Sequence, residues 1–364
     1  GPDPADPTGK RRLGCSPGVA TQDPVHVARF TGKGKHIAKY LLFAAREIRE
    51  TLAAHGIRRV GDVVGRRDLL QPKPDLCGKA SLIDFGTALA PPSLRIPNRD
   101  YVAQTRAHMP ELRDEERKAA LRALEGEDLE IREHLSNEDR CVGMGAAGII
   151  ARSRGDLGLS AGSLKFRHEG AAGHFYAAYS VPGLRFCLTG SAADSCFTAA
   201  YGGKLVIRQP EGQDGLTVVG NTFGYGARGG CAFLAGKAGN RFGICFRKST
   251  ENGGPTVVVE GVEANAFQYM TGGTAVVLGP TGFNLGAGMT GGVVFLLDYD
   301  PETLNHDYVA ARPLEGDEEA KVKDLVQRHL AESGSKRAAC LLKEWDPARF
   351  VRVATKLKPE PVDD

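Results

Sequence analysis

Three short apolar segments decide the fold prediction: Leu164-Lys-Phe-Arg-His-Glu-Gly170, Leu184-Arg-Phe-Cys-Leu-Thr-Gly190 and Lys204-Leu-Val-Ile-Arg-Gln-Pro210. They start about 20 residues apart, and similar runs follow: CAFLAG from Cys231, RFGICF from Arg241, TVVVEG from Thr256, TAVVLG from Thr274 and VVFLLD from Val293. Each is short and rich in β-branched or aromatic residues, so each is predicted to be a strand. A strand with glycine turns at this period is typical of a stacked solenoid. We therefore expect a mainly β protein containing a parallel β-helix.

The composition is that of a soluble globular protein without an obvious nucleic-acid function. The chain has 364 residues, of which 25% are charged and 41% hydrophobic. No apolar run is long enough to span a bilayer directly. A net charge of +3 is close to neutral for this length and gives no reason to expect nucleic acid as a partner.

The eight cysteines favour a reducing compartment. No two of them have C-x-x-C spacing, which argues against a structural zinc site and against a disulfide framework. We expect the cytoplasm or an organelle interior such as a matrix or stroma, and not secretion. The chain begins Gly1-Pro2, either a protease scar or the start of the chain, which leaves a removed targeting segment open.

Helical segments are expected on both sides of the repeat. Their apolar spacing predicts helices over Gly34–Leu52, Ile57–Leu70 (with Val60, Val63 and Val64 facing inward), Glu115–Leu124 (charged, with a solvated face), Glu318–Leu330 and Ala338–Trp345. The expected organisation is a mobile N-terminus over 1–14, a helical and extended segment over 15–136, the β-helix over 137–300 and C-terminal helices with a tail over 301–364.

Three G-x-G-x-x-G patterns occur, beginning at Gly143, Gly224 and Gly286. A dinucleotide-binding turn needs a strand before the pattern and a helix after it. The second and third patterns are followed by predicted strands, and the first lacks a convincing strand before it. We therefore interpret these glycines as positions of positive φ at the corners of coils.

No catalytic, cofactor-binding or metal site is expected from the polar residues. His168 and His174, with Glu169 between them, offer two ligands at most, whereas a metal site needs three or four. Asp194, Ser195 and Cys196 suggest a nucleophile, but no base is placed beside them. Asp139-Arg140 is interpreted as an ion pair.

Several long motifs resemble the C-terminal part of the glutamate synthase large chain. The strongest are Val258-Val-Glu-Gly-Val-Glu263, Tyr269-Met-Thr-Gly-Gly-Thr-Ala-Val-Val-Leu-Gly-Pro-Thr-Gly282 and Asn284-Leu-Gly-Ala-Gly-Met-Thr-Gly-Gly292. His329, Ser333-Gly-Ser335, Trp345 and Phe350-Val-Arg-Val353 fit as well. Gly18-Val-Ala-Thr-Gln-Asp-Pro24 resembles the end of that family's FMN barrel, and Gly34–Leu70 the helices that close it. The resemblance implies a right-handed β-helix, the GXGXG domain, with a structural role.

The same resemblance shows what the sequence lacks. The family makes glutamate from glutamine and 2-oxoglutarate with an amidotransferase domain and a barrel that holds FMN and a three-iron cluster. Neither the amidotransferase nor the body of the barrel has a counterpart here. Cys15 matches one iron–sulfur ligand, Lys10 stands where the family has another cysteine, and a lone thiolate cannot hold a cluster.

Two interpretations of function follow from the resemblance. In the first, the chain is a non-catalytic structural subunit, a pseudoenzyme docked among the protein subunits of a larger complex. In the second, it is the β-helix part of a working glutamate synthase whose FMN barrel, iron–sulfur cluster and amidotransferase lie on other chains. Both predict protein partners and no catalysis by this chain alone; an unsuspected enzyme that uses a face of the β-helix is the remaining alternative.

Overall fold

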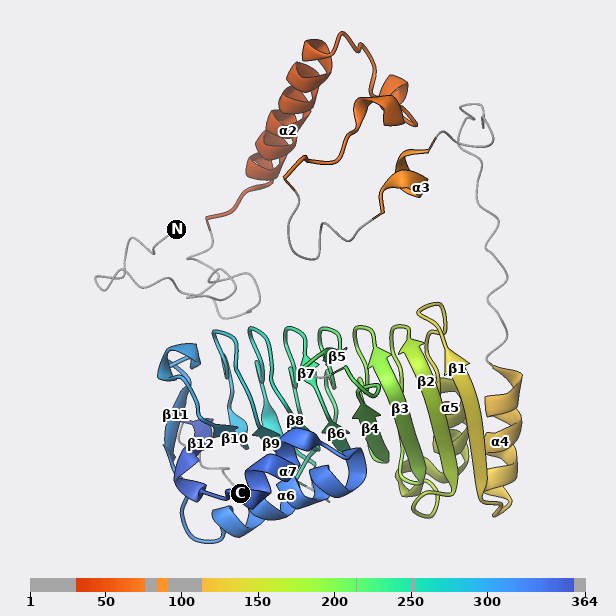
Figure 1. Ribbon diagram of the computed structural model, residues 1–364, viewed down its shortest axis with the longest axis vertical. Helices are drawn as coiled ribbons and strands as arrows, with labels where there is room; N and C mark the ends of the chain where they lie inside the picture. Colours follow the sequence, from red (N-terminus) through yellow and green to blue (C-terminus); the bar gives the residue numbers. More distant parts are fainter. Residues whose placement is uncertain (1–30, 76–83, 91–112, 214, 250–252, 357–364) are drawn as a thin grey trace. The chain divides into compact units, whose positions relative to one another are not determined.

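The computed structural model describes residues 31–75, 84–90, 113–213, 215–249 and 253–356 (Figure 1). Cys15 lies outside these residues. The chain divides into two compact units, Gly1–Met109 and Pro110–Asp364. The helix α4 and the strand β1, which precede the expected start of the repeat at residue 137, lie in the second unit.

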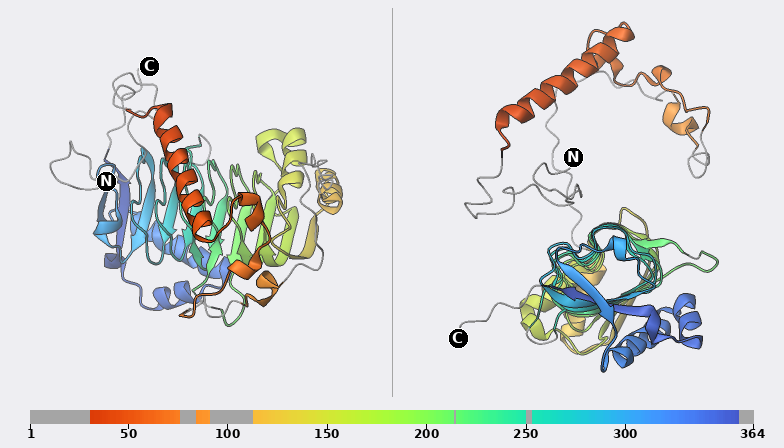
Figure 2. Two further views of the ribbon diagram at one scale, coloured as in Figure 1. Left: turned by 90° about the horizontal axis from the view of Figure 1, so that it is seen from above. Right: turned by 90° about the vertical axis from the view of Figure 1, so that its left-hand side faces the viewer.

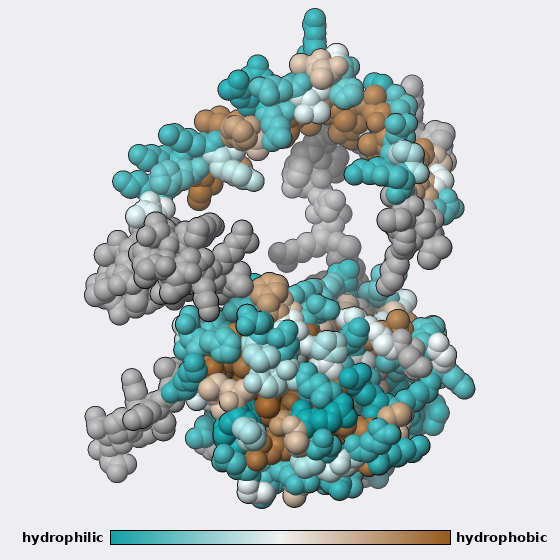
Figure 3. All heavy atoms as spheres, turned by 60° about the vertical axis from the view of Figure 1, so that its left-hand side comes forward, coloured by the Kyte–Doolittle hydropathy of each residue, from teal (hydrophilic) through white to brown (hydrophobic). Residues whose placement is uncertain are grey.

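The described residues of the first unit form one long helix and several short turns. This helix, α2, spans Gly34–Ala54 and confirms the predicted helix from Gly34. It is followed by the 3-10 turns η1 (Val60–Val63) and η2 (Arg67–Leu69) and by the single-turn helix α3 (Gly86–Leu89). Val60 and Val64 are exposed, so the prediction that they face inward is wrong. No α2 residue is buried, and apolar side chains remain visible on this unit, the upper one in Figure 3.

One twelve-stranded sheet organises the second unit (Figure 1). Its main path runs β1-β2-β3-β4-β6-β8-β9-β10-β12-β11, and β5 and β7 pair beside that path. Pairs from β1 to β10 are parallel, whereas β12 is antiparallel to both β10 and β11. The strands are β1 (Leu129–Leu135), β2 (Leu164–Ala172), β3 (Leu184–Ala192), β4 (Lys204–Arg208), β5 (Thr217–Val219), β6 (Cys231–Leu234), β7 (Lys237–Ala238), β8 (Thr256–Val259), β9 (Thr271–Val277), β10 (Gly291–Leu297), β11 (Val309–Pro313) and β12 (Phe350–Thr355).

The register places equivalent residues of successive repeats side by side. Leu164 pairs with Leu184 and Phe166 with Phe186. The rings of Phe166 and Phe186 stack with their centroids 4.6 Å apart. The predicted strands from Leu164, Leu184, Lys204, Cys231, Thr256, Thr274 and Val293 are therefore confirmed, because all of them lie in this sheet.

The segment RFGICF is a turn, not a strand. Arg241, Gly243 and Cys245 all have positive φ and alternate with the buried Phe242 and Phe246. The prediction failed because apolar alternation with period two is the same in this turn as in a half-buried strand. Left-handed residues at every second position bend the chain in a way that a strand does not.

The same alternation recurs in six turns, which together form what we call the turn layer. Its left-handed positions are 175/177/179, 195/197/199, 222/224/226, 241/243/245, 265/267/269 and 284/286/288. Backbone hydrogen bonds join neighbouring turns: Gly224 N donates to Cys196 O at 2.8 Å and Gly226 N to Ile244 O at 3.2 Å. The turn layer is thus hydrogen-bonded from repeat to repeat, as the strands are.

The main core lies between the strands and the turn layer. Alternate strand residues, such as Leu205 and Ile207 of β4, point into it, together with aromatic residues of the turns such as Phe197 and Phe223. The intervening strand residues point to the opposite, outer face of the sheet. Figure 2, right, shows the strands and turns around this core in a view along the stack.

Two helices cover part of the outer face and create a second core. These are α6 (Glu318–Ser333) and α7 (Lys336–Lys343). Outward residues of β4, β6, β8, β9 and β10 pack against apolar residues of the two helices; this second cluster includes Val206, Phe233, Val258, Val276, Phe295, Val322, Leu325, Val326, Ala338 and Leu341. The predicted apolar face of α6 is therefore confirmed. Trp345 lies just beyond the end of α7.

The helices α4 (Asp114–Leu124) and α5 (Met144–Arg154) lie at the β1 end of the sheet (Figure 1). One side of α4 is buried, including Glu116, Ala119, Ala120 and Ala123. The opposite side, with Glu115, Lys118 and Arg122, is exposed, so the predicted solvated face of this helix is confirmed. Among the described residues, no helix is long and apolar enough to cross a membrane.

The predicted fold class, a mainly β protein built as a right-handed parallel β-helix, is wrong. The structure is a mixed α/β fold, a mostly parallel sheet combined with helices of 21, 11, 11, 16 and 8 residues, and a right-handed β-helix is not shown. The repeat predicted strands and their parallel stacking but not what covers them. A parallel sheet with apolar residues on both faces needs helices on the second face, and α6 and α7 provide them.

Candidate functional site

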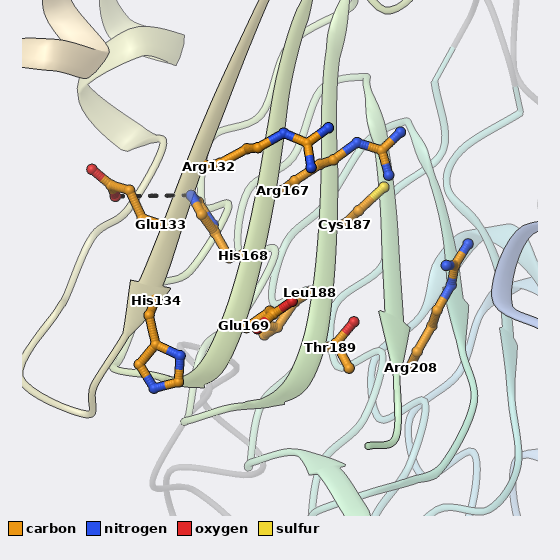
Figure 4. A pocket seen from close by; sticks show the side chains of 10 residues that line it. All are labelled: Arg132, Glu133, His134, Arg167, His168, Glu169, Cys187, Leu188, Thr189 and Arg208. Atoms are coloured by element: carbon orange, nitrogen blue, oxygen red, sulfur yellow. Dashed lines mark ion pairs between the residues drawn. The ribbon is translucent and has the colours of Figure 1, made fainter. Parts of the chain in front are cut away.

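The part of the outer face at the end of α6 and beyond it is polar. It consists of the outward residues of β1–β3 with the ends of β4, and we call it the open face: Glu130, Arg132, His134, Lys165, Arg167, Glu169, Arg185, Cys187, Thr189, Lys204 and Arg208. A cleft of about 390 Å³ lies at this part of the sheet, between β1 and β4 (Figure 4). The open face is the candidate functional site because it combines charged, exposed side chains with a cleft.

Two guanidinium groups of the open face share one carboxylate. Arg167 Nε donates to Glu130 Oε2 at 2.7 Å, and Arg132 also pairs with Glu130. The hydrogen bond from Arg167 lowers the pKa of Glu130. In Figure 4 the side chains of Arg132 and Arg167 lie side by side. This arrangement holds two like charges close together with only one negative charge between them.

Directly beneath the open face lies a buried polar cluster on the inner side of the sheet. His168 Nδ1 is 3.1 Å from Tyr176 Oη, and His168 Nε2 is 3.9 Å from Glu133 Oε2 (dashed line in Figure 4). Burial, reinforced by the charge of Arg113, lowers the pKa of His168 to about 4. His168 is therefore neutral at pH 7, and its Nε2 has no hydrogen-bond partner among the described residues.

Arg113 connects this cluster to α4. Its guanidinium group pairs with Glu116 at 3.1 Å, with Asp139 at 3.1 Å and with Glu133. The prediction that Asp139 pairs with Arg140 is therefore wrong, because Asp139 pairs with Arg113. Sequence spacing could not reveal this contact because 26 residues separate the two side chains.

Glu116 occupies the N-terminal end of α5, the helix that follows the first glycine pattern. Its Oε2 accepts a hydrogen bond from the backbone N–H of Gly143 at 2.9 Å, and only 3% of the residue is exposed. Burial raises the pKa of Glu116 to about 7, although the Gly143 amide and the Arg113 charge oppose the shift. A side-chain carboxylate thus already lies where a nucleotide phosphate would bind in a dinucleotide fold.

The other two glycine patterns belong to the turn layer. Gly143, Gly224, Gly226, Gly286 and Gly288 have positive φ, which confirms the predicted conformation for these five glycines. The other glycines of the three patterns, Gly145, Gly148, Gly229 and Gly291, do not have positive φ. The amides of Gly143, Gly224, Gly226 and Gly286 are engaged within the fold; for example, Gly286 N donates to Ala266 O at 2.9 Å. These loops therefore do not offer the free amide cradle that a pyrophosphate requires.

The structure separates the two histidines singled out in the sequence. His168 is buried on the inner side of β2, whereas His174 is exposed in the following turn. No group of three or more His, Cys, Asp or Glu residues in the described part of the chain could hold a metal ion. The single family ligand match, Cys15, lies outside the described residues.

Asp194, Ser195 and Cys196 are neighbours in the turn layer but have separate partners. Asp194 Oδ1 accepts from Asn221 N at 2.7 Å, and Ser195 Oγ lies 3.0 Å from Thr222 Oγ1. Cys196 is fully buried, and burial strongly raises the pKa of its thiol. This thiol is therefore not a ready nucleophile.

A second buried network, which sequence reasoning missed, joins α6 to β8. His329 Nε2 lies 3.4 Å from Glu260 Oε1, and His329 Nδ1 lies 3.4 Å from Ser333 Oγ. Ser333 Oγ donates to the carbonyl oxygen of His329 at 2.6 Å, and Ser335 Oγ donates to Glu260. Although the residue types are those of a hydrolytic triad, the serine hydroxyl is committed to its own helix. The network fastens α6 and α7 to the sheet.

Comparison with known proteins places this structure in a family. A family model described as "GXGXG motif" matches residues 112–356. The chain belongs to this family. A second model, described as "Conserved region in glutamate synthase", matches residues 13–58.

Relatives that match this chain over most of its length are glutamate synthases. The chloroplastic ferredoxin-dependent glutamate synthase of Spinacia oleracea is 32% identical over 96% of this chain and 22% of its own length. The large chains of the NADPH glutamate synthases of Bacillus subtilis and Azospirillum brasilense are 32% and 34% identical, each over 94% of this chain and 23% of their own length. The resemblance to the C-terminal region of the large chain is thus confirmed, and the chain spans less than a quarter of these relatives.

Proposed function

We propose that the chain is a non-catalytic scaffold in a glutamate synthase-type assembly. The observation that carries this proposal is the filled interior of the GXGXG region. Rings stack along the core, for example Phe166 on Phe186 at 4.6 Å and Phe223 on Phe242 at 4.8 Å. Strands and turn layer are hydrogen-bonded from repeat to repeat around this core. Such a body, with its interior occupied by stacked rings, offers other proteins its surfaces.

The polar groups inside the fold support a structural role. Arg113 is surrounded by three carboxylates, and Glu116 caps α5. Glu260, His329 and Ser333 tie α6 to the sheet. Each group therefore has a partner that explains its presence without a reaction.

The likeness over nearly the whole chain supports the choice of assembly. The relatives are ferredoxin-dependent or NADPH glutamate synthases, and the match includes residues 13–58 in addition to the GXGXG region. On this proposal, the FMN barrel, the three-iron cluster and the amidotransferase belong to other parts of the assembly. The chain holds those parts at fixed positions while they form glutamate from glutamine and 2-oxoglutarate.

A second candidate is a scaffold retained in an assembly without glutamate synthase chemistry. The observation in its favour is Lys10, which stands where the family has a cluster-binding cysteine. In this case the chain keeps a structural role although the iron–sulfur cluster has been lost. The partners would then be unrelated subunits.

Two measurements test the proposed function. The purified chain should show no flavin or iron–sulfur absorption and should form no glutamate from glutamine and 2-oxoglutarate. A gentle pull-down from the native source should give a yellow-brown eluate with chains or segments that carry the barrel and the amidotransferase. A colourless eluate of unrelated subunits would favour the second candidate, and stoichiometric FMN on the purified chain would contradict both.

A further inference from the structure

The open face carries more positive than negative charge. Its cations are Arg132, Lys165, Arg167, Arg185, Lys204 and Arg208, and its own carboxylates are only Glu130 and Glu169. The parallel register places Lys165 beside Arg185, and Arg185 beside Lys204. Like charges on adjacent strands repel each other unless a carboxylate lies over them. The face is therefore built to receive negative charge.

One carboxylate of the chain already shows how this face binds an acidic group. Glu332, at the end of α6, accepts from Arg185 at 2.6 Å and also pairs with Lys204. Arg208 donates to the backbone carbonyl oxygen of Glu332. The helix ends one residue later, at Ser333. The helix α6 therefore ends next to the point where Glu332 neutralises Arg185 and Lys204.

The cations beyond this point are left with too few partners. Arg132 and Arg167 share Glu130, and their side chains are 74% and 49% exposed. Lys165 forms no ion pair with any residue that the structure describes. These cations lie on β1 and β2, whereas the two cations that pair with Glu332 lie on β3 and β4.

We propose that the open face docks an acidic segment of a partner chain, whose carboxylates pair with Arg132, Lys165 and Arg167 and extend the line of contacts that Glu332 begins. The inference rests on the proposed scaffold role. Arg132 and Arg167 are register partners on neighbouring strands, about 4.8 Å apart, and Lys165 lies two residues before Arg167, about 6.6 Å along β2. An acidic segment that continues from Glu332 across β2 and β1 places a carboxylate over each of these positions. Charge complementarity of this kind gives an interface its specificity and its association rate.

Fluorescence anisotropy of a labelled oligo-glutamate peptide with the purified full chain tests the docking site. The double charge reversal R132E/R167E should weaken binding at least tenfold at low ionic strength. The matched control R152E/K343E makes the same change in net charge at two exposed cations away from the open face and should stay within twofold of the unchanged protein. Unaltered melting temperatures in both variants exclude misfolding as the reason.

A gain of binding provides the complementary test. The substitution E130Q removes the carboxylate that Arg132 and Arg167 share, so peptide binding should strengthen about threefold at low ionic strength and weaken as salt is added. Equal loss in R132E/R167E and in the control, weaker binding by E130Q, or equal binding of an oligo-lysine peptide would overturn the proposal. Displacement of the peptide by inorganic phosphate at matched ionic strength would assign the face to small anions and overturn it as well. If the native pull-down succeeds while peptide binding fails, only the face assignment is lost.

Discussion

The outer face of the sheet is closed over β4–β10 and open over β1–β3, although the strands pair in parallel along this whole stretch. In the closed half, outward residues such as Val206, Phe233 and Val258 form a core with α6 and α7. In the open half, the equivalent positions carry Arg132, Arg167 and other charged groups. The strands pair in parallel in both halves, and the helices lie over the strands whose outward side chains are apolar.

The inner side differs between the halves in the same way. Beneath the closed half the core is apolar, with Val257, Ala275 and Val294 as examples. Beneath the open half, His168, Glu133 and Glu116 interrupt it. The interior of the open half therefore depends on ion pairs and hydrogen bonds, such as those of Arg113 and Glu116, in addition to apolar packing.

The largest effect should come from the second core. Phe233 is fully buried, faces the ring of His329 at 6.2 Å and has the guanidinium of Arg328 over its ring. The substitution F233A should lower the free energy of unfolding by about 3–5 kcal/mol because it leaves a cavity between β6 and α6. Urea unfolding measures the change. The control T189A, on the open face, should cost less than about 0.5 kcal/mol; similar losses in the two variants would contradict the comparison.

The next effect depends on pH and concerns the interior beneath the open half. The pKa of Glu116 is raised to about 7 from 4.5, so the folded state favours the protonated form. The native protein should therefore lose stability as pH rises from about 4.5 to about 7, and the loss should level off above that range. The substitution E116Q removes the titration and should gain up to about 3 kcal/mol at pH 8 relative to the native protein.

Urea unfolding at pH 5 and pH 8 measures this difference. The exposed neighbour Glu115 provides the control, since E115Q should change stability equally little at both pH values. If the stability of the native protein changes between pH 5 and pH 8 by the same amount as that of E116Q, the raised pKa of Glu116 is refuted.

Glycine substitutions should not distinguish the two halves. A Cβ at Gly190, in the open half, would lie 1.8 Å from Gly170 O, and one at Gly273, in the closed half, 2.7 Å from Pro255 O. Both glycines have positive φ. G190A and G273A should each cost at least about 2 kcal/mol, whereas G212A, with positive φ but no atom within 4 Å of its Cβ, should cost about 1 kcal/mol. Thermal melting of the three variants is the measurement, and equal losses would remove close approach as the cause.

The smallest effect concerns the boundary between the halves. Burial raises the pKa of Glu332, but the hydrogen bonds from Lys204 and Arg185 prevail and the net pKa is lowered. The contribution of Glu332 is therefore present above its unfolded pKa and is lost as pH falls through the lowered folded value. E332Q should cost about 1 kcal/mol at pH 7. This loss should shrink in acid, and a loss that grows below pH 4 would be inconsistent with the lowered pKa.

The sequence was most informative where side chains repeat. The spacing of Leu164, Leu184 and Lys204 predicted three strands and their parallel stacking, and the spacing of Val322, Leu325 and Val326 predicted the buried face of α6. Hydrophobic periodicity reports which residues are buried, and that information is local. It does not report which other element buries them, so the pairing of α6 with the outer face, and with it the mixed α/β class, was not predictable.

The polar contacts were the least predictable part. Glu116 lies on a charged helix that reads as solvated, yet it is buried at the end of α5, 27 residues away. Arg113 and Asp139, and likewise Glu260 and His329, meet only because the chain returns to the same place. The open face was not predicted either. Its residues alternate with core residues along each strand, and they form an exposed polar surface because α6 and α7 do not extend over them.

The turn layer and the strands opposite it together make the repeat region resistant to bending. The amides of the turn layer bond to the turns on either side, as with Gly224 to Cys196 and Gly226 to Ile244, while the strands opposite form their own ladder. Bending in either direction must stretch one of these two rows of bonds, and stacked aromatic rings between them resist compression. A displacement applied at one end of the repeat should therefore be carried along both rows of hydrogen bonds to the other end.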